Sequence, residues 1–205
     1  MKKKIFVIII ILILFGATTY FVYNHLEKDD TLYKEAEVID TIKIDNYNYT
    51  LEDRDTKLYK NLYKSLKEVL DKDNIDFKDY AEVLSKLYIT DLYTINNKIT
   101  KYDVGSLEFV FPEVIDNYKL NVMDTLYKYI ESDAYDDRIQ ILPEVSEVNI
   151  SSIEDNKFEY NNKSYDGYKV SIDWKYKEDL GYETDATLYL IKIDDILYVA
   201  SETHE

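Results

Sequence analysis

Residues Tyr168–Tyr176 read YKVSIDWKY. Apolar or aromatic side chains occupy every second position of this stretch, and the positions between them are polar or charged. A period of two is typical of a β-strand that has one face on a hydrophobic core and the other in water. The stretch therefore predicts a half-buried strand, and it places Trp174, the only tryptophan of the chain, in the middle of the buried face.

The chain on both sides of this strand keeps the same period from Glu144 onward. We expect further strands at Val148–Ile150, at Phe158–Tyr160 after a polar turn at Glu154–Asn156, at Thr184–Ile193, and at Ile196–Ser201 after a tight reversal at Asp194-Asp195. Because strands that follow one another in sequence usually lie side by side, the simplest topology is an antiparallel meander.

The chain before these strands has helical spacing. Apolar residues recur every three or four positions in Thr56–Asp71, Phe77–Ile95 and Val114–Ser132, which predicts three helices. Asp53 or Asp55 is expected to cap the first helix, and Asp76 the second. Ser106–Phe111, which is followed by a proline, is expected to form a short strand. Helices followed by strands predict an α+β domain over residues 55–205, in which helices pack on an antiparallel sheet.

An uncharged stretch lies near the N-terminus. Ile5–Tyr23 reads IFVIIIILILFGATTYFVY, and as a helix it would be about 28 Å long, close to the ~30 Å apolar core of a bilayer. Three lysines precede it and acidic residues follow it. Because positive residues stay on the cytoplasmic side, we expect a cytoplasmic tail at 1–4, a transmembrane helix at 5–23 and an extracytoplasmic connector at 24–54. This connector either stays a stalk or adds a short strand.

A cleaved signal peptide is the alternative interpretation of this stretch. It requires a short apolar core that ends at a small-x-small cleavage site. The best candidate, Gly16-Ala17-Thr18, is followed directly by more aromatic and apolar residues. We therefore expect a single-pass protein of the cell membrane with its C-terminal domain outside the cytoplasm.

The composition excludes several kinds of function. The formal net charge is −16, and three of the 25 basic residues precede the apolar stretch. Nucleic-acid binding is therefore not expected, because it needs basic patches that displace counterions from phosphates. The chain has no cysteine, which excludes disulfides and thiolate metal sites. The acidic surface is expected to keep the domain dispersed in solution.

The predicted helix Val114–Ser132, the strand Tyr168–Tyr176 and the terminal hairpin Leu188–Ala200 together carry a resemblance. This order of elements resembles the nuclear-transport-factor-2-like (cystatin-like) superfamily, in which a curved sheet wraps a helix into a cone. The resemblance covers residues of roughly 55–203 and implies a cone-like fold. With the N-terminal span, the layout is also similar to the bitopic assembly proteins of type IV secretion and Gram-positive conjugation machines, whose domains of this kind act as scaffolding.

Residues that could carry chemistry are sparse. His25 follows the predicted span and His204 is next to the C-terminus, so we expect both to be solvated and neither to reach a core pocket. Asp71–Asp76 lacks the glycine that a calcium loop needs at its sixth position, so a helix–helix connector is expected there. Asp173 lies on the polar face of its strand. We therefore predict no catalytic residue, no metal site and no cofactor.

The expected function is binding or scaffolding outside the membrane without catalysis, with a protein partner or a second copy of the chain. The alternatives are an assembly component of a secretion or conjugation apparatus, and a small-ligand sensor or enzyme that uses the interior of the cone. The candidate pocket or core residues are Trp174, Tyr168, Tyr176, Tyr118 and Tyr129. Two or more buried polar groups that converge in a deep pocket would favour the sensor or enzyme, and a filled apolar cone would favour the scaffold.

Overall fold

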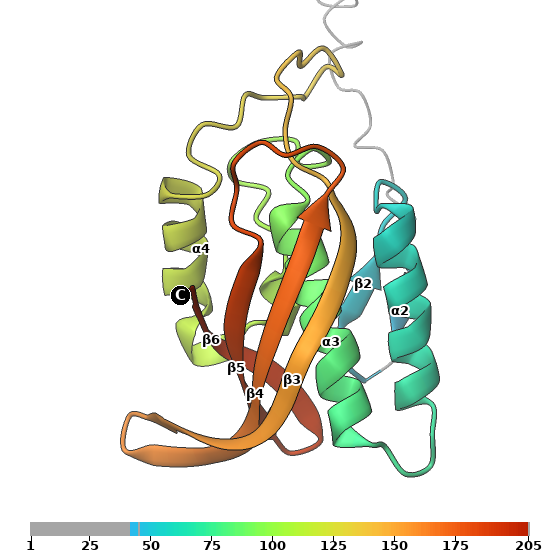
Figure 1. Cartoon of the computed structure of the whole chain (residues 1–205), viewed down its shortest axis with the longest axis vertical. Coiled ribbons are helices and arrows are strands. Elements are labelled where there is room, and N and C mark those ends of the chain that lie inside the picture. The colour runs from blue at the N-terminus through green and yellow to red at the C-terminus, as the bar shows by residue number, and fades with distance from the viewer. Residues whose placement is uncertain (1–41, 45, 205) are drawn as a thin grey trace, which may run out of the picture. The chain divides into compact units, whose positions relative to one another are not determined.

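The strand predicted from YKVSIDWKY forms the second half of β4 (Lys163–Tyr176) in a computed structural model, which describes residues 42–44 and 46–204. The other strands of its sheet are β3 (Val145–Tyr160), β5 (Asp185–Ile193) and β6 (Ile196–Thr203). Their order is β3-β4-β5-β6 and every pair is antiparallel, so the predicted meander is confirmed. The sheet is curved, and its β3–β4 end bends away from the other strands (Figure 1).

The alternating face of β4 is buried as predicted. Val170, Ile172 and Trp174 are almost inaccessible, whereas Tyr168 and Tyr176 are half-buried. The indole ring of Trp174 packs against the ring of Tyr93, with 4.5 Å between the centroids. Trp174 is therefore a core residue of the contact between the sheet and the helices.

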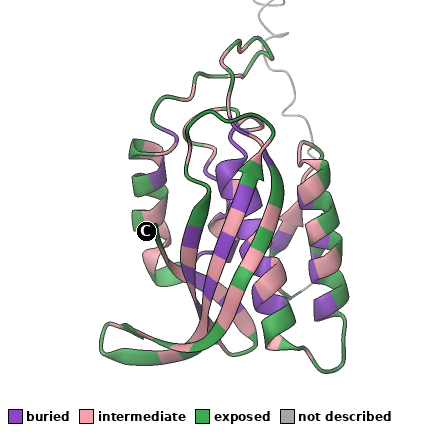
Figure 2. Cartoon of the chain, in the orientation of Figure 1, coloured by how far each residue is buried: buried purple, intermediate pink, exposed green. Residues whose placement is uncertain are grey.

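The polar turn predicted at Glu154–Asn156 is wrong, because β3 is one continuous strand. These residues pair with Gly167–Lys169 of β4, and the reversal comes later, at Asn161-Asn162. Both asparagines have positive φ, 47° and 60°, a conformation that asparagine tolerates better than most residues. The three polar residues instead belong to the exposed part of a long hairpin (Figure 2).

Three described α-helices pack on this sheet, so the α+β class is confirmed. They are α2 (Lys57–Leu70), α3 (Phe77–Tyr93) and α4 (Ile115–Asp124). Asp76 caps α3 as predicted, and its carboxylate accepts from the amides of Lys78 and Asp79. The cap of α2 is Thr56 and not an aspartate, because the carboxylate of Asp55 accepts from the amide of Glu52.

The third helix is shorter than predicted. It is preceded by a 3-10 turn, η3 (Pro112–Val114), and it ends at Asp124 instead of Ser132. After Asp124, the helical spacing of apolar residues no longer indicates which side chains are buried. Tyr127 is fully buried, and its hydroxyl donates to the carbonyl of Leu92 at 2.7 Å. Tyr129, a predicted core residue, is 77% exposed, and this prediction is wrong.

The strand predicted at Ser106–Phe111 is also wrong. The segment forms a 3-10 turn, η2 (Leu107–Phe109), which follows Ser106 at a φ of 63°. The left-handed backbone at Ser106 interrupts an extended path, and the serine amide and hydroxyl are held by Asp91 and by the carbonyl of Tyr88. The segment pairs with the sheet through one isolated parallel bridge, between Val110 and Val199 of β6.

A small hairpin lies within the segment that the sequence assigns to the connector. β1 (Ile42–Ile44) pairs antiparallel with β2 (Tyr49–Leu51), and Tyr49 is fully buried. The predicted span at 5–23 lies outside the described residues. Within residues 42–44 and 46–204, no helix has the length and apolar character to cross a membrane.

Replacing Trp174 with alanine should lower the free energy of unfolding by about 3–5 kcal/mol, because it removes a large buried ring and leaves a cavity. The measurement is chemical denaturation of the two chains. Tyr129→Ala is the matched control, since this ring is exposed and its loss should change stability by about 0.5 kcal/mol or less. Equal effects of the two substitutions would contradict the assignment of Trp174 to the core.

Candidate functional site

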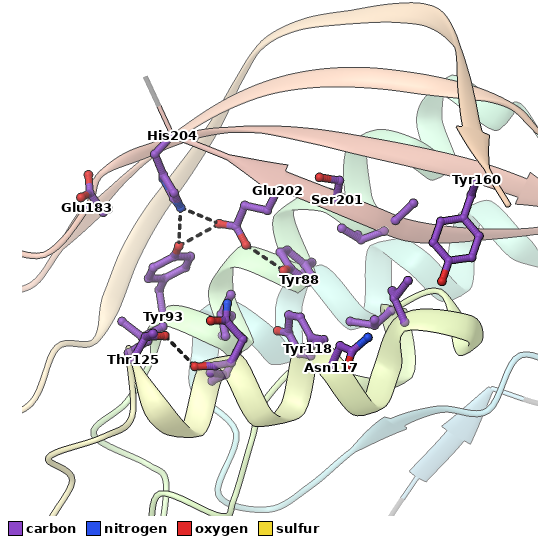
Figure 3. Close-up of a pocket in the computed structure, with 18 residues that line it drawn as sticks. Tyr88, Tyr93, Asn117, Tyr118, Thr125, Tyr160, Glu183, Ser201, Glu202 and His204 are labelled. Atoms are coloured by element: carbon purple, nitrogen blue, oxygen red, sulfur yellow. Dashed lines mark hydrogen bonds and ion pairs between the residues drawn. The ribbon is translucent and has the colours of Figure 1, made fainter.

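A cleft of about 690 Å³ opens between α4 and the C-terminal end of β6, with α3 at its base. Figure 3 shows that side chains from all three elements point into it. Its apolar lining comes mainly from Leu92, Val110, Val122 and Val199. Its polar residues include a cluster around Glu202, and others lie along the cleft, such as Asn117 and Tyr160.

The carboxylate of Glu202 accepts two hydrogen bonds from tyrosines of the central helix. The hydroxyl of Tyr88 donates to Oε2 and the hydroxyl of Tyr93 donates to Oε1, both at 2.8 Å. The side chain of Glu202 is only 14% exposed. Two phenols therefore hold a largely buried carboxylate at the base of the cleft (Figure 3).

A β-bulge turns Glu202 toward the helices. Leu190 pairs with Val199 but Tyr189 pairs with Ser201, so Ala200 is an extra residue in β6. One extra residue exchanges the two faces of a strand. After the bulge Glu202 pairs with Leu188, a fully buried residue, and so faces the core side of the sheet.

The same exchange of the two faces of β6 brings His204 to the edge of the cleft. Its Nδ1 lies 2.8 Å from the carbonyl oxygen of Asp185, which can only accept, so Nδ1 carries a hydrogen. Its Nε2 lies 3.2 Å from the hydroxyl of Tyr93 and 3.4 Å from Oε1 of Glu202. His204 is an exposed residue, as expected, but its side chain, 35% exposed, also lines the cleft.

Burial keeps Tyr88, Tyr93 and Tyr118 protonated. It raises the pKa of Tyr88, Tyr93 and Tyr118 well above the ordinary value of 10.0, and the nearby Glu202 raises the pKa of all three further. These phenols therefore remain hydrogen-bond donors at any physiological pH. Tyr88 and Tyr93 stabilise the carboxylate of Glu202 without supplying a positive charge.

The five predicted pocket or core residues lie in different parts of the structure. Tyr118 of α4 lines the cleft, and Trp174 lies in the core behind it. The hydroxyl of Tyr176 donates to the carbonyl of Glu183 at 2.8 Å, which holds the loop before β5. Tyr168 lies on the β3–β4 hairpin, and Tyr129 is exposed.

Sequence reasoning missed Glu202, Tyr88 and Tyr93 as functional residues. Tyr88 belongs to the apolar stripe of its helix and looks like an ordinary core residue, whereas Tyr93 is not part of that stripe. Glu202 lies just beyond the predicted end of its strand. The bulge at Ala200, which gives Glu202 its direction, has no signature in the sequence.

A second polar pocket, of about 230 Å³, lies beneath the segment 96–108. The carboxylate of Glu108 accepts from the amide and the hydroxyl of Thr50, at 3.0 and 2.6 Å, and from the hydroxyl of Tyr59 at 3.3 Å. Burial raises the pKa of Glu108 to about 7 and that of Asp55 to about 6. These contacts join β2, α2 and η2, so we assign a structural role to this pocket.

Comparison with known proteins adds no name to this geometry. No family model, curated protein or solved structure matches the chain. Within residues 42–44 and 46–204, no group of three or more histidine, aspartate or glutamate side chains has the arrangement of a metal site. The chemistry of the cleft therefore rests on its own residues.

The raised pKa of Glu108 predicts how stability changes with pH. In the folded chain the carboxyl group of Glu108 stays protonated up to about pH 7, whereas in the unfolded chain it has its usual pKa of 4.5. The stabilisation is thus fully present below pH 4.5 and is lost as the pH rises to about 7. Glu108→Gln stays neutral and should avoid this loss, which is about 3 kcal/mol at most.

The measurement is urea denaturation of the wild-type and Glu108→Gln chains at several pH values across this interval. Glu154→Gln, at an exposed position of β3, is the control and should follow the wild type. Parallel pH profiles for the wild type and Glu108→Gln would contradict the burial of a protonated Glu108.

Proposed function

We propose that the chain is a membrane-anchored, extracytoplasmic domain that binds a small ligand in the cleft between α4 and β6. The observation that supports this function is the convergence of Tyr88, Tyr93, Tyr118, Glu202 and His204 on one cavity. Several polar groups that meet in a deep pocket are what separates a ligand-binding or catalytic cone from a filled, apolar one. The membrane anchor is the uncharged stretch 5–23 of the sequence.

The size and lining of the cleft support this proposal. Its volume of about 690 Å³ is within the range of about 300–1,000 Å³ that is usual for small-molecule sites. An apolar wall with a small number of polar groups is also typical of such sites. The ligand is expected to place an apolar part along α4 and a polar group against Glu202.

The cone-like arrangement of the nuclear-transport-factor-2-like superfamily is part of the same proposal. Three helices on a curved antiparallel sheet are compatible with that resemblance. A ligand between the sheet and a helix would then occupy the interior of the cone. We propose binding rather than catalysis, because the geometry of the cleft does not define a reaction.

A second candidate function, binding of a protein partner, is favoured by exposed apolar side chains in the segment 129–141. Ile139 is 92% exposed, and Tyr135 and Ile141 are also exposed. The segment is held in place by Arg138, which donates to the carbonyls of Lys98 and Asn96. A fixed segment with exposed apolar residues would suit the scaffolding role expected from the sequence.

Filling the cleft should abolish ligand binding without unfolding the chain. Asn121 lies on α4 with its side chain at the cleft, so Asn121→Trp places a large ring there. Leu120→Trp is the matched control, because Leu120 is on the same helix, is 56% exposed and does not line the cleft. The measurement is a thermal-shift screen of a small-molecule library against the full-length wild type and both variants.

We expect compounds that raise the Tm of the wild type and of Leu120→Trp to leave the Tm of Asn121→Trp unchanged. Compounds that stabilise all three chains equally would show that binding occurs elsewhere. A library without any stabilising compound, combined with capture of a partner that Ile139→Ser abolishes, would favour the protein-binding function instead.

A further inference from the structure

We infer that the ligand of this cleft is a small organic cation, whose positive charge pairs with Glu202 while aromatic rings surround it. This inference rests on the proposed function and names the chemical class of the ligand. It follows from three properties of the cleft, namely the charge balance of its lining, the aromatic rings around that charge, and the lack of a metal-binding arrangement.

The charge balance of the cleft is negative. Among the described residues, its lining includes the carboxylates of Glu183 and Glu202 but no lysine or arginine. Nε2 of His204 lies 3.4 Å from Oε1 of Glu202, and the two side chains form an ion pair only when the imidazole is protonated. A largely buried carboxylate is stabilised by an opposite charge, and the two tyrosines supply only neutral donors. A cationic ligand would provide the missing charge.

Glu202 retains hydrogen-bonding capacity for such a ligand. An ionised carboxylate has about four acceptor positions, and one tyrosine hydroxyl occupies a position on each oxygen. The side chain is still 14% exposed, so a cation in the cleft can approach its negative charge. The tyrosine hydroxyls also fix the orientation of the carboxylate before a ligand arrives, which lowers the entropic cost of binding.

Aromatic rings form much of the surface around this carboxylate. Tyr88 and Tyr93 contact Glu202, and the ring of Tyr118 lies 6.2 Å from that of Tyr88 between centroids, whereas Tyr160 lines the far end of the cleft (Figure 3). The face of an aromatic ring attracts cations, and recognition of quaternary ammonium groups uses rings in this way. An anionic ligand would be disfavoured, because the carboxylate of Glu202 and the negative faces of the rings both repel it.

An organic cation suits the cleft better than a metal ion does. A metal ion needs several charged or imidazole ligands at short range. The described part of the chain contains no group of three or more such side chains arranged for a metal. The apolar lining, by contrast, matches the hydrocarbon part of an organic ligand. A substituted ammonium group satisfies both the carboxylate and the apolar wall.

The test uses three probes of nearly the same shape and different charge. They are choline, its uncharged carbon isostere 3,3-dimethylbutan-1-ol, and the anion 3,3-dimethylbutanoate. Each is titrated at neutral pH into the full-length chain in detergent micelles, and binding is followed by backbone amide chemical shifts in NMR. Glu202→Gln removes the charge but keeps the shape of the side chain, and Glu154→Gln removes the same charge at an exposed site of β3.

We expect choline to shift amides of the cleft and to bind roughly ten- to a hundredfold more tightly than the neutral isostere, because only choline attracts the carboxylate and the faces of the aromatic rings through a positive charge. Glu202→Gln should remove this preference, and Glu154→Gln should keep it. If the neutral or anionic probe binds in the cleft as tightly as choline, the cation inference fails but the proposed ligand site stands. If no probe shifts the amides of the cleft, both fail.

Discussion

A buried tyrosine must keep its hydroxyl hydrogen-bonded, and this constraint determines how the core of this protein is assembled. An unpaired polar group in an apolar interior costs free energy comparable to that of a lost hydrogen bond. The chain has 22 tyrosines, and many of them are buried. The hydroxyl of Tyr127 reaches the carbonyl of Leu92, and Tyr63 donates to the carbonyls of Ile42 and Tyr49. Each of these bonds joins segments that are distant in sequence.

The same constraint produces the cleft. Tyr88 and Tyr93 belong to α3, the helix that is buried between α2 and the sheet, and backbone carbonyls of their own helix are already bonded. Their hydroxyls are satisfied by a carboxylate from β6, Glu202, which the bulge at Ala200 turns inward. This arrangement places the largely buried carboxylate of Glu202 beside the apolar wall of the cleft. A cleft with that charge and without an internal lysine or arginine among its described lining favours a cationic ligand.

Local patterns in the sequence predict most of the fold. The alternation in Tyr168–Tyr176 predicts β4, and helical spacing together with Asp76 predicts α3, because these features depend on residues close in sequence. The end of α4 and the path of Ser106–Phe111 depend instead on distant partners, such as the carbonyl of Leu92 for Tyr127 and Asp91 for Ser106. Of the candidate site, helical spacing predicts Tyr118, but Glu202 and His204 are not predictable, because one inserted residue in β6 decides that they face the helices.

The central claim is that Glu202 and the tyrosines of α3 stabilise each other as partners across the base of the cleft. A double-mutant cycle of Tyr93→Phe and Glu202→Leu, measured by chemical denaturation, tests it most directly. Each single substitution leaves a buried polar group with fewer partners, so the double substitution should cost less than the two single costs together, by about 1–3 kcal/mol. Additive costs, within about 0.5 kcal/mol, would show that the two side chains are not partners and would contradict this account of the cleft.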